Sequence, residues 1–152
     1  MSIFVHYRYI MIALSEHLCF KTYAVSRCIT GLYKPYLDEI SLTYPQYLVM
    51  LVLWENGTMN IGKIGEHLHL DNGTLTPLLK RMEKNGLLSR KRSTDDERVV
   101  LIGLTKNGKL LKDKARHIPE AVQKSFHLDE EKKKQLMSAL DEILSTQSLS
   151  KI

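Results

Sequence analysis

The sequence predicts a mainly helical α+β fold in which several helices surround one β-hairpin. Three observations support this prediction: apolar residues recur at helical spacing in six segments, two short helices meet at a tight turn, and one pair of β-type runs follows them. The chain has 152 residues. This is the length of one domain, and it is sufficient to bury a core unaided.

The first two helices differ in how they begin and end. Apolar residues at helical spacing predict a long helix over 14–38, with Pro35 near its end. Because this helix has few polar residues, we expect it to be buried from two directions, as at a subunit interface. Thr43-Tyr44-Pro45 begins a second, almost wholly apolar helix, which Asn56-Gly57 ends.

Two short helical patterns follow, the first defined by Ile61, Ile64 and Leu68 and the second by Leu75, Leu78, Leu79 and Met82. In the turn between them, Asp71 and Asn72 can cap the second helix by accepting hydrogen bonds from its first backbone N–H groups. Asn85-Gly86 stops the second helix in a left-handed conformation. Two short helices joined in this way form a helix-turn-helix arrangement.

Beyond it, the runs Leu87–Lys91 and Val99–Leu104 predict a β-hairpin with a polar, exposed tip. Thr105 caps a helix that Pro119 breaks or kinks, and Asp129 caps the last helix. The order of these elements predicts a winged helix-turn-helix. In such a fold the second short helix enters the major groove of DNA and the hairpin reaches the adjacent minor groove.

The charge distribution favours the same interpretation. The formal net charge is only +5, but seven cations fall within about nineteen residues of the second short helix and the hairpin. Basic residues on one exposed helix usually form only a solvated face, but here a capped turn and a basic hairpin accompany them. The residues predicted to contact DNA or to shape its contacts are Asn72, Thr74, Thr76, Pro77, Lys80, Arg81, Lys84, Arg90, Lys91, Arg92, Asp96 and Arg98.

Several of these motifs resemble the MarR family of dimeric bacterial regulators, with the closest match to its organic-hydroperoxide-sensing, OhrR-like branch. The Asp96-Glu97-Arg98 segment is similar to the wing of the whole family. The branch is marked by Leu18-Cys19-Phe20 and by Gly73-Thr74-Leu75-Thr76-Pro77. The resemblance covers roughly residues 14–119 and extends through Tyr33-Lys34-Pro35 and Thr43-Tyr44-Pro45-Gln46-Tyr47.

The resemblance implies a role for several parts of the chain. Arg98 would enter the minor groove at the tip of the wing, and Asp96 would help to hold the wing. The N- and C-terminal helices of two subunits would form a homodimer. Its two recognition helices would then lie about one DNA turn apart on a pseudo-palindromic operator.

Cys19 is the candidate redox centre. A thiol attacks a peroxide as the thiolate, and Tyr23, four residues further on, lies on the same helical face and can donate a hydrogen bond to the sulfur. The resemblance adds Tyr33 and Tyr44 as hydroxyl donors from the partner subunit. Oxidation to sulfenic acid, followed by a mixed disulfide or further oxidation, would release DNA. The alternative for Cys19 is a buried structural thiol.

Cys28 does not complete a disulfide within the first helix, because nine helical positions place it half a turn away and roughly 13 Å along the axis from Cys19. Two-cysteine members of the branch use a resolving cysteine in the C-terminal part of the partner, and this chain has no cysteine after Cys28. We therefore expect a low-molecular-weight thiol as the second reactant and Cys28 as a small apolar filler. An intersubunit Cys19–Cys28 bond stays open.

Other classes of site and location fit less well. His67 and His69 are two residues apart, which is not the spacing of a zinc pair, so we predict no metal and no cofactor. The apolar run Ile10–Leu14 is too short to cross a membrane, and there is no signal-peptide pattern. Only two cysteines in 152 residues indicate a reducing cytoplasm.

The predicted organisation is a flexible extension over 1–13, one domain over 14–145 and a frayed tail over 146–152. Within the domain, 14–40 and 106–145 serve dimerisation and 58–104 bind DNA. The predicted function is that of a transcriptional repressor, not an enzyme, that releases its operator when Cys19 is oxidised by an organic peroxide. One alternative is a repressor released by a small aromatic ligand, with Cys19 incidental. A thiol peroxidase is the other alternative, but residues 16–21 contain no activating Arg and Thr motif.

Overall fold

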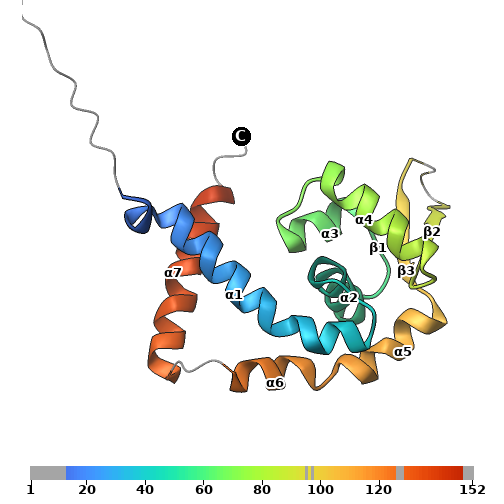
Figure 1. Cartoon of the computed structure of the whole chain (residues 1–152). Coiled ribbons are helices and arrows are strands. Elements are labelled where there is room, and N and C mark those ends of the chain that lie inside the picture. The colour runs from blue at the N-terminus through green and yellow to red at the C-terminus, as the bar shows by residue number, and fades with distance from the viewer. Residues whose placement is uncertain (1–12, 95, 97, 126–128, 149–152) are drawn as a thin grey trace, which may run out of the picture. The chain divides into compact units, whose positions relative to one another are not determined.

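The computed structural model describes residues 13–94, 96, 98–125 and 129–148 (Figure 1). The predicted extension up to residue 12 and the end of the predicted tail, from residue 149, lie outside the described residues. The chain forms two compact units, one ending at Ile118 and the other beginning at Pro119. The elements in chain order are the 3-10 turn η1 (Leu14–Glu16), α1 (Leu18–Glu39), α2 (Tyr44–Asn56), β1 (Met59–Asn60), α3 (Ile61–Leu68), α4 (Asn72–Lys84), β2 (Leu88–Arg92), β3 (Val100–Leu104), α5 (Lys106–Ala115), α6 (Ile118–Lys124) and α7 (Glu130–Ser148).

The predicted mainly helical, winged helix-turn-helix fold is confirmed, with three differences in detail. The first long helix begins at Leu18, because residues 14–16 form a separate 3-10 turn. A short strand, β1, precedes α3 and is too short to leave a periodic pattern in the sequence. The last helix continues to Ser148, beyond the predicted start of the tail.

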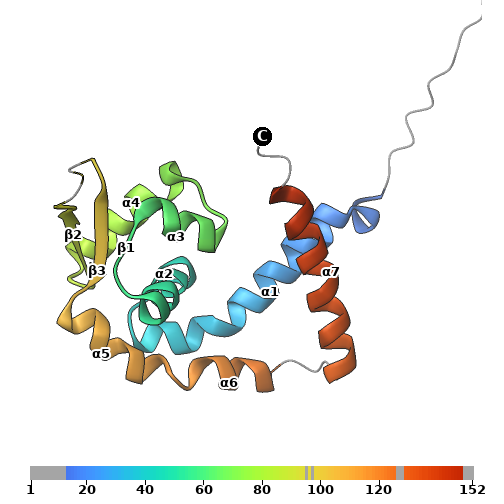
Figure 2. The ribbon, with the colours of Figure 1, turned by 180° about the vertical axis from the view of Figure 1, so that it is seen from behind.

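Helix α2 forms the centre of the first unit. It begins with a capping box, in which the backbone N–H of Thr43 donates to Gln46 Oε1 at 2.9 Å. Its almost wholly apolar sequence is explained by its neighbours, because α2 contacts α1, α3, α5 and β3. The views from both sides show α2 between α1 and the α3–α4 pair (Figures 1 and 2).

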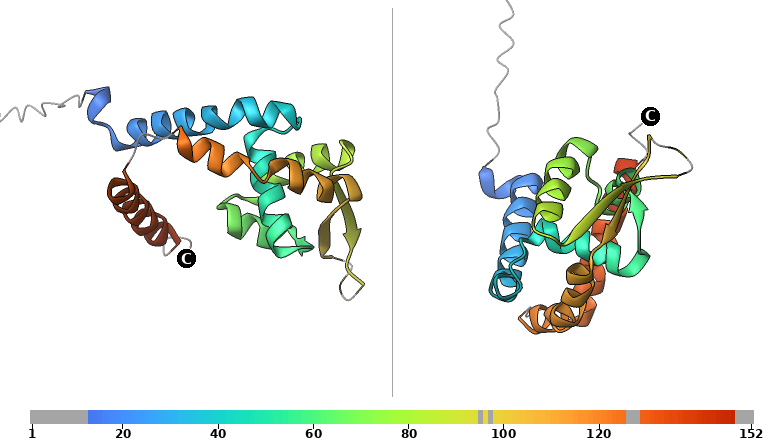
Figure 3. Two further views of the ribbon diagram at one scale, coloured as in Figure 1. Left: turned by 90° about the horizontal axis from the view of Figure 1, so that it is seen from below. Right: turned by 90° about the vertical axis from the view of Figure 1, so that its right-hand side faces the viewer.

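The three strands form one antiparallel sheet in the order β1-β3-β2. Strands β2 and β3 pair from Leu88 opposite Leu104 to Arg92 opposite Val100. Met59 of β1 pairs with Ile102 on the other edge of β3. Figure 3 shows β2 and β3 side by side as an arm at the edge of the first unit, which is the wing that the sequence predicts.

The two flanking helices leave apolar side chains uncovered within one chain. In α1 only Leu37 is buried, whereas Leu18 is 66% exposed and Val25 is 49% exposed. The described residues of the first unit therefore do not bury α1 from two directions, and its predicted burial at a subunit interface stays a prediction. In the second unit, α7 also exposes a set of large apolar residues, and these are Leu136, Met137, Leu140, Ile143 and Leu144.

Candidate functional site

Two side-chain caps build the helix-turn-helix. The backbone N–H of Lys63 donates to Asn60 Oδ1 at 2.8 Å and starts α3. Asp71 starts α4 in the same way, accepting at 2.8 Å from the backbone N–H of Thr74, and its other oxygen accepts from Thr74 Oγ1 at 2.9 Å. These two hydrogen bonds hold the pKa of the Asp71 carboxyl below its usual value. The carboxylate thus stays charged at the positive end of α4.

The turn between α3 and α4 is tight because the backbone comes close to Gly65. A Cβ atom at Gly65 would lie 2.6 Å from the carbonyl oxygen of Leu70. His69 ends α3 with a left-handed φ of 51°, and Gly86 follows α4 with a φ of 70°. The predicted left-handed stop after α4 is therefore present. The cap from Asn60 and the left-handed His69 were not predicted from the sequence.

Helix α4 presents two different faces. Its apolar residues, Leu75, Leu78, Leu79 and Met82, are buried. The predicted DNA-contacting residues that lie exposed on α4 are Asn72, Thr74, Pro77, Lys80, Arg81 and Lys84. Thr76 is half-buried, and its hydroxyl donates to the carbonyl oxygen of Asn72 at 2.7 Å. Because the apolar residues of α4 are buried, its exposed face is polar and basic and is available for a partner.

The basic residues of the wing do not all lie in the same environment. Lys91 and Arg92 are exposed on β2. Arg90 is half-buried, with its Nη1 3.9 Å from Glu83 Oε2 on α4, and its Nε is buried without a hydrogen-bond partner. Arg90 thus connects the wing to α4. Its predicted contact with DNA stays a prediction.

The described part of the loop at the tip of the wing is organised by Asp96. The backbone N–H of Arg98 donates to Asp96 Oδ1 at 2.9 Å, and the backbone N–H of Val99 donates to the carbonyl oxygen of Asp96, also at 2.9 Å. These bonds fold the chain back toward β3. The Arg98 side chain lines a surface hollow of about 330 Å³ together with Asn72 and Thr76 of α4. The structure therefore brings the start of α4 and Arg98 of the wing to one place.

Cys19 lies at the other end of the first unit, as the second residue of α1, and it is exposed and free. Tyr23 follows one turn later and is 58% exposed. Its hydroxyl accepts a hydrogen bond from Arg27 Nη1 at 3.1 Å. Cys28 is also exposed and free, so it does not fill a gap in the core of this chain as we expected.

Tyr33 and Tyr44 form a separate aromatic group. Their ring centroids are 5.0 Å apart, and the ring of Tyr47 lies 5.9 Å from that of Tyr33. Fourteen helical residues separate Tyr33 from Cys19, which is roughly 21 Å along α1. One chain therefore does not bring the four predicted redox residues together. Their convergence needs a second copy, as the resemblance implied.

Burial keeps these phenols protonated. It raises the pKa of Tyr33 and of Tyr44, and it raises the pKa of Tyr47 to about 12, with neighbouring phenols adding to the shift for Tyr44 and Tyr47. At neutral pH each hydroxyl is thus a hydrogen-bond donor. Tyr47 Oη is buried and has no hydrogen-bond partner.

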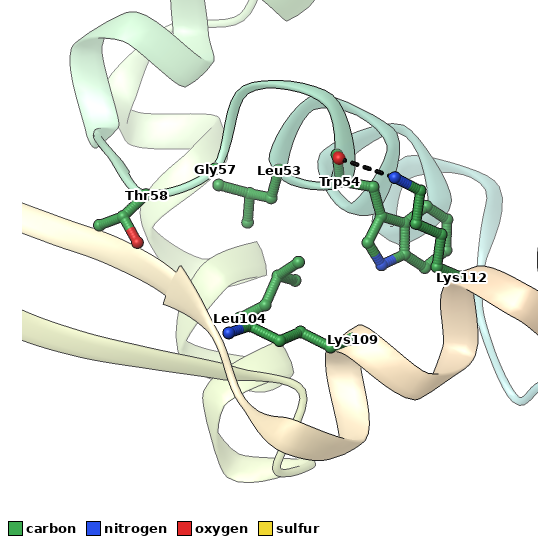
Figure 4. A pocket seen from close by; sticks show the side chains of 7 residues that line it. All are labelled: Leu53, Trp54, Gly57, Thr58, Leu104, Lys109 and Lys112. Atoms are coloured by element: carbon green, nitrogen blue, oxygen red, sulfur yellow. Dashed lines mark hydrogen bonds between the residues drawn. The ribbon is translucent and has the colours of Figure 1, made fainter.

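A second hollow, of about 340 Å³, lies between α2 and α5 (Figure 4). Its apolar side is formed by Leu53 and Leu104, and Lys109 and Lys112 contribute charged side chains. Lys112 Nζ donates to the carbonyl oxygen of Trp54 at 3.1 Å, and Trp54 Nε1 donates to the carbonyl oxygen of Gly108 at 2.9 Å. These bonds fasten α5 to the central helix.

Among the described residues, no group of three His, Cys, Asp or Glu side chains is placed to hold a metal ion. None of the described helices has the length and apolar character needed to span a membrane.

Comparison with known proteins decides the family. The sequence model of the family described as transcriptional regulator SarA/Rot matches residues 31–115. The chain is 54% identical over 133 residues to the organic hydroperoxide resistance transcriptional regulator of Bacillus subtilis (strain 168), which covers 88% of this chain and 90% of that protein. The chain belongs to the MarR family of transcriptional regulators, in its organic-hydroperoxide branch.

Two further similar proteins support the assignment of this MarR-family regulator. It is 39% identical over 132 residues to the regulator SarZ of Staphylococcus aureus (strain USA300), covering 87% of this chain and 89% of that protein. A solved structure described as reduced AbfR bound to DNA superposes with a TM-score of 0.72 at 37% identity, covering 88% of this chain and 93% of the other.

Family membership confirms the predicted class, a DNA-binding transcriptional regulator. It also supports the predicted partners, because regulators of this type are dimers that bind DNA. The roles of the individual DNA-contacting and redox residues stay predictions.

Proposed function

We propose that this regulator is a homodimeric repressor that releases a pseudo-palindromic operator when an organic hydroperoxide oxidises Cys19. The observation that carries the proposal is an exposed, free thiol at the start of α1 in a chain 54% identical to an organic hydroperoxide resistance regulator.

The proposed oxidation consumes one peroxide for each thiol. The thiolate sulfur of Cys19 attacks one peroxide oxygen, so that an S–O bond forms and the O–O bond breaks. The sulfur loses two electrons and becomes sulfenic acid, and the leaving alkoxide takes a proton and becomes an alcohol. A low-molecular-weight thiol then condenses with the sulfenic acid to give a mixed disulfide and water. We place this chemistry in the cytoplasm, where a reducing thiol pool resets the sensor.

The DNA-binding half of the proposal uses the exposed face of α4 and the wing. Two copies would insert their α4 helices into successive major grooves, and Arg98 would reach the minor groove beside each. Tyr33 and Tyr44 of one copy would donate hydrogen bonds to Cys19 of the other. Oxidation would disrupt this contact between the copies, and the spacing of the two α4 helices would change.

A gel-shift experiment with the natural operator tests this proposal. Cumene hydroperoxide is added to the wild type and to Cys19→Ser, each bound to the operator. We expect the wild type to release DNA and Cys19→Ser to retain it, while both bind equally before oxidation. Equal release by the two proteins would overturn the thiol switch.

The hollow between α2 and α5 favours a second candidate function, release by a small aromatic ligand. It combines apolar and cationic side chains next to the bonds that hold α5 to α2. In that case Cys19→Ser would respond to the ligand as the wild type does, and peroxide would release neither protein. The same gel-shift experiment therefore separates the two candidates.

A further inference from the structure

Three residues lie at four-residue intervals along α1: Cys19, Tyr23 and Arg27. Residues four apart lie one above the other on a helix, so these side chains form one stripe. Arg27 Nη1 donates a hydrogen bond to Tyr23 Oη at 3.1 Å, and Arg27 Cζ lies 5.7 Å from the centre of the same ring. The guanidinium thus holds the phenol that is closest to Cys19 in the sequence.

This contact has a chemical consequence for the phenol. Arg27 donates and Tyr23 Oη accepts, so the hydroxyl hydrogen of Tyr23 stays available for another acceptor. A hydroxyl that accepts a bond from a cation becomes a stronger donor, because successive hydrogen bonds polarise one another. Cys19 is the residue one turn earlier on the same stripe, and its sulfur can accept such a bond.

The other cations of α1 do not have this arrangement. Lys34 makes an ion pair with Asp38 at 2.6 Å, and Lys21 is two residues from Cys19, a spacing that points the two side chains to different faces. The pKa of Arg27 is raised above its usual value, mainly by the hydrogen bond to Tyr23 and by the interaction with the phenol's charge, with a smaller contribution from Cys28. The guanidinium therefore remains charged beside this tyrosine.

The geometry points to Arg27 as a positioning residue that accelerates the oxidation of Cys19 by organic hydroperoxides through the hydroxyl of Tyr23. Arg27 orients the phenol of Tyr23 so that its hydroxyl donates to the sulfur of Cys19 and holds that sulfur toward the peroxide. This inference rests on the proposed function. It adds a cation to the thiol site, two helical turns from the sulfur.

The experiment measures the rate of Cys19 oxidation in the full-length protein. Cumene hydroperoxide is added, the sulfenic acid is trapped with dimedone, and the product is quantified by mass spectrometry after trypsin digestion. Cleavage after Lys21 separates Cys19 from Cys28, so each thiol is followed on its own peptide. Arg27→Gln should oxidise Cys19 about tenfold more slowly than the wild type. Arg27→Lys should recover much of the rate because it keeps a charged donor.

Two further variants test whether Arg27 acts through Tyr23. In a double-mutant cycle, adding Arg27→Gln to Tyr23→Phe should not slow oxidation further, because the phenol that Arg27 orients is already absent. Lys34→Gln is the matched control. It also removes a cation from the exposed surface of α1, and it should oxidise at the wild-type rate.

The results distinguish a failure of the role of Arg27 from a failure of the proposed function. An unchanged rate in Arg27→Gln, or an equal further loss in the Tyr23→Phe background, would overturn the role of Arg27. The proposed function would survive either result as long as Cys19→Ser keeps the operator bound in peroxide. If Cys19→Ser instead releases the operator as the wild type does, the proposed function itself fails.

Discussion

The winged-helix region, residues 59–104, and the flanking helices α1 and α7 differ in how far their hydrogen-bonding groups are paired and their apolar side chains are buried. In the winged-helix region the two helices begin with side-chain caps and bury their apolar faces, and the three strands are paired. In α1 and α7 large apolar side chains remain exposed. The first backbone N–H groups of α3 and α4 find side-chain partners locally, although Arg90 Nε is buried without one, whereas many apolar side chains described in the flanking helices are exposed.

This difference indicates that the two regions depend to different degrees on contacts with a second copy of the chain. The helix-turn-helix and the wing are held by hydrogen bonds within one chain. Exposed apolar side chains are stabilised by burial, so we expect the second copy of the dimer to bind at α1 and α7. On this expectation, a signal that acts between the copies alters the spacing of the two winged-helix regions without unfolding either.

The largest expected effect is on the flanking helices. Leu140→Asp on α7 places a charge in the apolar face and should weaken the dimer by at least about a hundredfold, because an unpaired charge is costly to bury. Sedimentation velocity measures the change in mass, and far-UV circular dichroism should show unchanged helix content. Ser138→Asp adds the same charge to the polar face of α7 and should leave the dimer intact. A dimer equally stable in both variants would show that the α7 face is not the interface.

A smaller effect, of opposite sign in α5 and α1, is expected for glycine-to-alanine substitutions. A Cβ atom at Gly108 would collide with the carbonyl oxygen of Leu87, so Gly108→Ala should lower the free energy of unfolding by about 2 kcal/mol. Gly31 on α1 has nothing within 4 Å of such an atom. Gly31→Ala should therefore raise the free energy of unfolding by about 0.5–1 kcal/mol. Urea unfolding measures both, and a loss of stability in Gly31→Ala would contradict the openness of α1.

The smallest effect concerns the wing and leaves folding untouched. Arg98→Ala should weaken operator binding by about tenfold and should reduce the slope of log affinity against log salt by about one unit for each wing that contacts DNA. Fluorescence anisotropy at several salt concentrations measures both quantities. Arg116→Ala, which removes the same charge from the end of α5, is the control and should change neither. Unchanged affinity and slope in Arg98→Ala would remove Arg98 from the contacts with DNA.

Much of the winged-helix region could be predicted from the sequence because its signals are local. Asp71 and Thr105 lie directly before the helices that they cap, α4 and α5, and Gly57 and Gly86 mark the ends of α2 and α4. The hairpin follows from two β-type runs around a polar loop. Strand β1 escaped prediction because it is only two residues long and depends on pairing with the distant Ile102.

The candidate site residues also differ in whether the sequence alone predicts their positions. The exposed positions of Lys80, Arg81 and Lys84 follow from helical spacing, since the apolar residues of α4 take the opposite face. The half-buried position of Arg90 beside Glu83 does not, because it depends on how the wing packs against α4. The hydrogen bond from Arg27 to Tyr23 fits a four-residue spacing, but many pairs with this spacing make no contact.

By itself the sequence determined the order of the helices and of the hairpin strands, the caps from Asp71 and Thr105, the basic helix and wing, and the presence of a thiol near the start of the first long helix. These features depend on residues within a few positions of one another, where backbone geometry is fixed by local hydrogen bonds and sterics. Only the tertiary structure decided that Tyr33 lies against Tyr44, that Arg90 packs beside Glu83, and that Arg98 lies beside the start of α4. Such relations depend on packing between separate segments of the chain. The spacing of apolar residues in the sequence gives no information about the distances between such segments.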